Sequence, residues 1–127
     1  ADSAVRFWSV TGLVIRERQG IAAAHGELVS LLADPAPSVR VVAAEGLARF
    51  GGAADEGLAL RVLGDHANAS QQGTFVAIAA LNAIDQLEAR GESLLAALRQ
   101  QPAARALHPR YDSYVERLLR PRDAPNN

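Results

Sequence analysis

The chain has 127 residues, of which 13 are basic and 14 are acidic, so its formal net charge is −1. This near balance argues against a dedicated binder of nucleic acid or acidic membranes. The absence of cysteine excludes disulfides, thiolate metal sites and a thiol nucleophile. Alanine (26) and leucine (16) make up a third of the sequence against six aromatic residues, a composition that favours helices over a β-sandwich or barrel.

Apolar residues recur at helical spacing along the chain, and glycine or Asp-Pro separates the periodic stretches. The helices are expected at about 3–19, 21–33, 35–50, 53–64, 70–90, 92–106 and 110–120. No segment predicts a strand, so we expect one all-α domain over 1–120. The prolines and terminal asparagines of 121–127 predict a frayed tail.

No apolar run approaches the roughly 18 residues of a membrane span, and no signal peptide is recognisable, so we expect no membrane partner. The sequence also contains no methionine. From this absence we expect a processed product or a fragment of a longer polypeptide.

The sequence repeats itself with a period of 34 residues. Val5-Arg6 returns as Val39-Arg40. Gly12-Leu13 returns as Gly46-Leu47, and a further step of 34 brings Leu81 into the column of Leu47. A fixed period in this range indicates a helical solenoid, in which each unit buries its apolar side against its neighbours. We therefore predict about seven helices in three to four antiparallel pairs.

The stretch from Asp34 to Gly51 resembles the second helix of a HEAT repeat, with its aspartate, its Val-Arg and small residues where helices touch. The resemblance implies a short right-handed HEAT-like solenoid. It also implies a ladder of polar bonds between successive repeats that involves Asp34 and Arg40, with Arg6 at the arginine position of the repeat before. Independently of the resemblance, Asp34 is expected to cap the helix that follows it. The third repeat departs from the pattern, because Gly73-Thr74 replace Val-Arg.

A wider likeness covers most of the chain. The segments Ala4–Leu13, Ala80–Asp85 and Tyr114–Leu119 resemble the C-terminal HEAT-like extension of bacterial sulfatase-type hydrolases. The resemblance implies an accessory domain of an exported or periplasmic enzyme whose hydrolase part is missing here. The sulfatase nucleophile motif, Cys/Ser-x-Pro-x-Arg, is absent, and Ala36–Arg40 does not satisfy it.

No motif for catalysis or cofactor binding is present. His25, His66 and His108 lie about 40 residues apart and form no HxxxH or HExxH pair. The glycines form neither GxGxxG nor GxxxxGK, and no GxSxG elbow occurs. We therefore expect no catalytic residue, no metal site and no cofactor.

Two columns of the repeat hold apolar residues directly after Val-Arg. By the HEAT resemblance these positions line the concave face, and we expect them to dock a protein partner, with Trp8 as the anchor. The alternative is that one of the columns is core. The six residues are Phe7, Trp8, Val41, Val42, Phe75 and Val76.

These observations predict a non-catalytic scaffold or protein-interaction module. Its partner is a neighbouring domain of the same polypeptide or a separate protein. We also expect an exposed apolar flank near Phe7–Val10, which either a second copy of the chain or the neighbouring domain would cover. The competing class is an enzyme or ligand-binding protein with a site in the concave groove, either lyase-like or binding nucleic acid. Arginines do not cluster and acidic residues share the surface, so we expect no nucleic acid. A deep polar pocket would favour the competing class, and a shallow apolar groove would favour docking.

Overall fold

The computed structural model describes residues 2–68, 72–100, 109–121 and 123. Every regular element in these residues is helical, as the composition and periodicity predict. The end of the predicted helix 92–106, His108 and most of the predicted tail lie outside the described residues.

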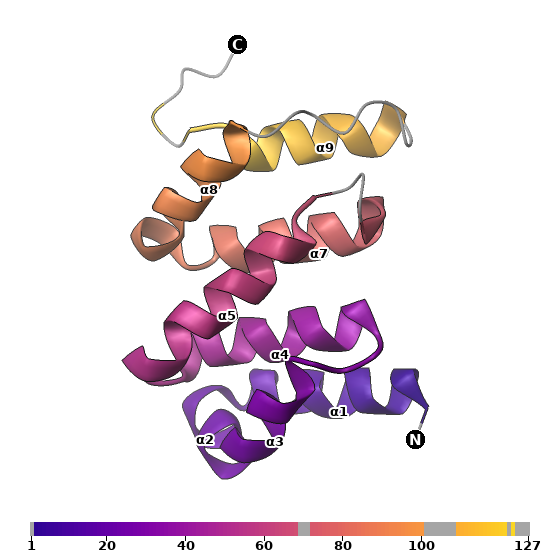
Figure 1. Cartoon of the computed structure of the whole chain (residues 1–127), viewed down its shortest axis with the longest axis vertical. Helices are drawn as coiled ribbons and strands as arrows, with labels where there is room; N and C mark the ends of the chain where they lie inside the picture. The colour runs from indigo at the N-terminus through magenta and orange to yellow at the C-terminus, as the bar shows by residue number, and fades with distance from the viewer. Residues whose placement is uncertain (1, 69–71, 101–108, 122, 124–127) are drawn as a thin grey trace.

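The described helices are α1 (Ser3–Ile15), α2 (Glu17–Ala23), α3 (His25–Leu31), α4 (Pro37–Phe50), α5 (Ala53–His66), α7 (Thr74–Asp85), the 3-10 helix η1 (Glu88–Gly91), α8 (Glu92–Arg99) and α9 (Pro109–Leu119). Helices α1, α4, α7 and α9 follow one another along the long axis of the molecule (Figure 1). Beside this row, α3 and α5 pack against α4, α5 also packs against α7, and α8 packs against α7 and α9. Each member of the row therefore packs against its neighbours in the row and against the helices beside it.

Small residues allow α4 to lie at the centre of these contacts. Ala43, Ala44 and Gly46 are buried, and Leu47 is fully buried beside them. A Cβ atom on Gly46 would meet the side chain of Ile21 at 2.8 Å and that of Val14 at 3.0 Å. A larger residue here would therefore have to push the side chains of Ile21 and Val14 away from α4.

The predicted boundaries of the first two helices are wrong. Helix α1 ends at Ile15, because Glu17 has a φ of 52°, a left-handed conformation that a non-glycine residue rarely adopts. Gly20, expected to end a helix, lies buried inside α2, where a Cβ would meet the carbonyl oxygen of Leu13. The predicted helix 21–33 is divided at Ala24 into α2 and α3.

Two further boundaries differ from the prediction. Asp34 is not the N-cap of the helix that follows it, because Ala36 holds that place and α4 begins at Pro37. Within the described part of the predicted helix 70–90, Gly73 separates the helical residue Gln72 from α7, and α7 ends at Asp85, before η1.

Candidate functional site

Five of the six predicted docking residues line one hollow on the face that α1, α4 and α7 share. Its volume is about 360 Å³. Val41 and Val42 are buried at its base, Phe7 and Val76 are half-buried, and Phe75 is 70% exposed. The lining residues are Phe7, Thr11, Ser38, Val41, Val42, Glu45, Phe75, Val76 and Ala79. We call this cavity the hollow.

Trp8 does not line the hollow, although the sequence predicts it as the anchor. Its side chain is 68% exposed, and its ring meets the ring of Phe7 edge to face at a centroid distance of 5.3 Å. It borders a neighbouring depression together with Ser3, Ala4 and Ser38. Phe75 is therefore the exposed aromatic ring on the hollow itself.

The apolar flank expected near Phe7–Val10 is exposed only in part. Val10 is buried against the core and Phe7 is half-buried, whereas Trp8 is open to solvent. The exposed apolar surface of α1 continues instead through Val5 and Ile15.

Two of the three polar side chains of the hollow, those of Thr11 and Glu45, already have partners. The hydroxyl of Thr11 donates to the carbonyl oxygen of Phe7 at 2.9 Å. The carboxylate of Glu45 accepts from Arg49, one turn further along α4, at 3.0 Å. The hollow therefore presents mainly carbon atoms, and its polar groups do not converge on one point.

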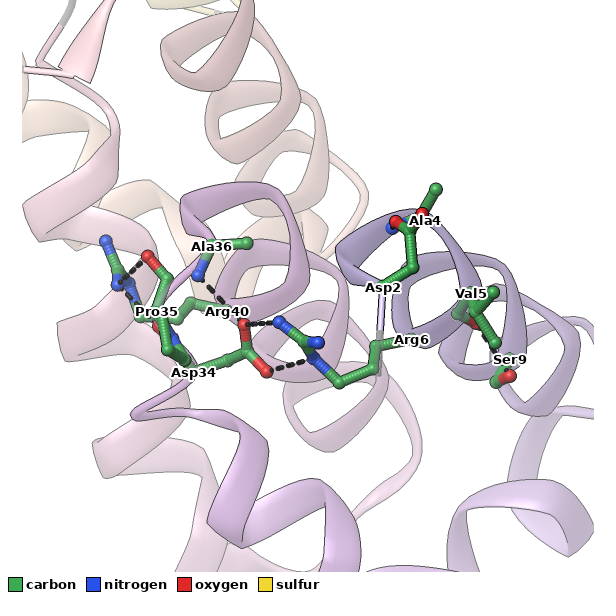
Figure 2. A network of polar contacts seen from close by, with 9 residues as sticks. All are labelled: Asp2, Ala4, Val5, Arg6, Ser9, Asp34, Pro35, Ala36 and Arg40. Atoms are coloured by element: carbon green, nitrogen blue, oxygen red, sulfur yellow. Dashed lines mark hydrogen bonds and ion pairs between the residues drawn. The ribbon is translucent and has the colours of Figure 1, made fainter.

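Asp34 joins α1 to the turn that precedes α4 (Figure 2). Arg6 donates from Nε to Oδ2 at 2.7 Å and from Nη2 to Oδ1 at 3.0 Å, which is the bidentate geometry of a strong ion pair. The backbone N–H of Ala36 donates to Oδ1 at 2.8 Å. Asp34 is itself buried, so these bonds satisfy a carboxylate that water cannot reach freely.

These hydrogen bonds shift the pKa values of both Asp34 and Arg6. The hydrogen bond from Arg6 holds the pKa of the Asp34 carboxyl below its ordinary value of 3.8, against the opposite effect of burial. The N–H of Ala36 acts in the same direction as Arg6. The same hydrogen bond raises the pKa of the Arg6 guanidinium, again against burial. The pair is therefore fully charged at neutral pH.

Arg40 binds the backbone of Asp34 rather than its carboxylate. Its Nη1 donates to the carbonyl oxygens of Asp34 at 2.6 Å and of Pro35 at 3.3 Å. Its Nε donates to Nε2 of His66 at 2.9 Å. Nδ1 of His66 lies 2.7 Å from the carbonyl oxygen of Val62, which can only accept, so Nδ1 carries the proton and Nε2 offers its lone pair to Arg40.

The hydrogen bond of His66 with Arg40 was not predicted from the sequence. The spacing of the histidines fits no metal site, and His66 was expected in a turn. It lies buried at the end of α5. The repeat points to this residue only approximately: Asp34 follows Arg6 by 28 residues and His66 follows Arg40 by 26, whereas a strict period of 34 from Asp34 leads to Asn68. His66 thus accepts a hydrogen bond from Arg40, as Asp34 does from Arg6 in the repeat before.

Among residues 2–68, 72–100, 109–121 and 123, no group of three or more His, Cys, Asp or Glu side chains is arranged to hold a metal ion. His25 pairs with Asp55 at 2.7 Å and so links α3 to α5. In the same part of the chain, no helix has both the length and the hydropathy of a membrane span.

Comparison of the whole chain with protein-family models, curated proteins and solved structures gives no match.

Proposed function

We propose that the chain is a non-catalytic, HEAT-like helical repeat module that binds a protein partner through the hollow. The observation that carries this proposal is the meeting of Phe7, Val41 and Phe75, which lie 34 residues apart in the sequence, at one apolar cavity. The row of α1, α4, α7 and α9 supports the same interpretation, because repeat units that stack in register place equivalent side chains on one face.

The properties of the hollow favour one large apolar side chain of a partner peptide as its occupant. A volume of about 360 Å³ lies at the small end of the range for ligand sites. Buried valines at the base and the exposed ring of Phe75 give an inserted Leu or Phe side chain carbon contacts on several sides. An aromatic ring that is exposed until a partner covers it is a typical energetic centre of an interface.

A random peptide library displayed against the purified chain tests the proposal. We expect selected peptides to share a large apolar residue, and their affinity for the Phe75→Ala variant to fall at least about tenfold. Leu58→Ala is the matched control, because Leu58 is also an exposed apolar residue but lies on α5, away from the hollow. Peptides that bind wild type and Phe75→Ala equally well would contradict the proposed docking role.

We also propose that the module accompanies an exported, sulfatase-type hydrolase, which the resemblance of Ala4–Leu13 and Tyr114–Leu119 supports. The test is the sequence of the reading frame that encodes this chain. A preceding domain with the motif Cys/Ser-x-Pro-x-Arg would support the proposal. A frame that encodes no hydrolase domain would contradict it and leave the docking proposal unaffected.

A further inference from the structure

The face of α1 that points away from the core is apolar. Val5, Trp8 and Ile15 are 60%, 68% and 74% exposed, whereas Val10 on the opposite face is buried. Together with Gly12, these residues lie at successive spacings of three, four and three, which places them on one line along a helix. We call Val5, Trp8, Gly12 and Ile15 the α1 stripe.

Gly12 leaves a gap in the α1 stripe, and this gap is complementary to the large Trp8 side chain of a second copy. The glycine is exposed, and a Cβ built on it would have no atom within 4 Å. Trp8 and Gly12 are equally distant from residue 10 along the helix, and so are Val5 and Ile15. A twofold axis at the level of residue 10 therefore brings Trp8 of one copy over Gly12 of the other and Val5 beside Ile15.

The charges at the two ends of α1 favour the same antiparallel arrangement. Asp2 precedes the helix and Arg16 follows it. Arg16 is exposed and forms no ion pair with any described residue. An antiparallel pair places Arg16 of each copy near Asp2 of the other, whereas a parallel pair would bring like charges together.

We propose that two copies of this chain associate through their α1 stripes, with the two helices antiparallel. The residues of the α1 stripe do not line the hollow, toward which Phe7 and Thr11 of α1 are turned, and the stripe adjoins the hollow only where Trp8 meets Phe7. One helix face is smaller than the roughly 800 Å² per partner of a standard interface, so the dimer is reversible and depends on concentration.

Analytical ultracentrifugation between about 10 µM and about 1 mM tests the association, a range that covers weak dimers. We expect the average mass to rise toward that of a dimer for wild type and to stay at that of a monomer for Trp8→Glu. Phe75→Glu is the matched control, because Phe75 is equally exposed but lies on α7. We expect it to dimerise as wild type does, with circular dichroism checking that both variants are folded.

Two outcomes of this experiment would overturn the proposal. If the wild type is monomeric at every concentration, the α1 stripe does not join two copies of the chain, and another segment or another protein would have to cover it. Dimerisation that survives Trp8→Glu and is lost in Phe75→Glu would place the interface on another surface of the molecule.

Cysteine cross-linking tests the orientation, since the natural chain has no cysteine. Val5 and Ile15 are about 15 Å apart along α1, well beyond the roughly 7 Å Cα separation that a disulfide can span, so a bond between them must join two copies. We expect the double variant Val5→Cys, Ile15→Cys to form a covalent dimer under mild oxidation, and Val5→Cys alone to remain monomeric in a reducing-agent-free gel. Cross-linking of Val5→Cys alone with no gain in the double variant would contradict the antiparallel arrangement.

Discussion

Asp34 is the residue at which the polar bonds between α1 and α4 converge. Its carboxylate accepts from Arg6 and from the backbone of Ala36, and the Arg6 hydrogen bond is the main cause of its lowered pKa. The unfolded chain, in which this carboxyl has its ordinary pKa, therefore binds the proton first as the pH falls. The contribution of Asp34 to the free energy of unfolding is complete above pH 3.8 and is lost as the pH falls through the lower, folded-state pKa.

This linkage gives a prediction for Asp34→Asn. At about pH 6 we expect the variant to be less stable than wild type, because Arg6 loses the carboxylate to which it donates both bonds of the buried ion pair. Below about pH 4 we expect the difference in free energy of unfolding to narrow steadily, since the wild-type carboxyl becomes neutral as well. Urea unfolding at a series of pH values measures this difference.

Asp65→Asn is the control for this experiment. Asp65 is exposed near the end of α5, and its side chain has no hydrogen bond or ion pair with the described residues. We expect its effect on stability to be small and nearly constant with pH. A difference between wild type and Asp34→Asn that stays constant or widens in acid would show that the Arg6–Asp34 bond does not stabilise the fold.

The residues of this network could be predicted only in part from the sequence. The Val-Arg repeat and the preceding aspartate draw attention to Asp34, Arg40 and Arg6. Their partners could not be predicted, because Arg40 turns to the backbone of Asp34 and to His66. The role of His66 depends on where α5 ends, which the sequence predicts as residue 64 and the structure places at residue 66.

At the scale of elements, α4 depends on close approach to its neighbours, and Gly46 is the position that tests this. We expect Gly46→Ala to lower the free energy of unfolding by about 1–3 kcal/mol, because its Cβ would overlap Ile21 and Val14. Gly57→Ala is the matched control in α5: the site is exposed, and a Cβ there meets no atom within 4 Å. We expect it to raise stability by about 0.5–1 kcal/mol, as removal of a helical glycine does.

Chemical denaturation of both variants measures the difference between these glycines. Equal effects of Gly46→Ala and Gly57→Ala would mean that helix propensity alone decides the outcome. The close contact of α4 with α1 and α2 would then contribute nothing measurable.

The elements themselves were predictable where the chain signals its own ends. Helix α4 begins at Pro37 and is followed by Gly51, and α5 begins one residue after Gly52, so their predicted ranges are nearly correct. The break at Glu17 carries no such signal, because a charged residue in a left-handed conformation is held there by its surroundings. The sequence also gives no signal for the division between α2 and α3 at Ala24, since alanine is the strongest helix former.

On the scale of the whole molecule, the row of helices depends on α4, which contacts α1, α3, α5 and α7. Leu47 is fully buried there, and we expect Leu47→Ala to cost about 2–5 kcal/mol in free energy of unfolding. Leu58→Ala removes the same atoms from an exposed site on α5 and should cost less than about 1 kcal/mol. Thermal and urea unfolding compare the two, and similar losses would show that α4 is not the centre of the core.

The exposure of Trp8 has a consequence for how the molecule can be observed. It is the sole tryptophan of the chain, and its indole lies largely in water in the folded state. Unfolding therefore changes the polarity around the ring little, whereas a second surface laid over α1 would remove water from it. The emission spectrum of this one fluorophore should shift to shorter wavelength on association and hardly respond to denaturant, which gives a label-free optical signal for contact at α1.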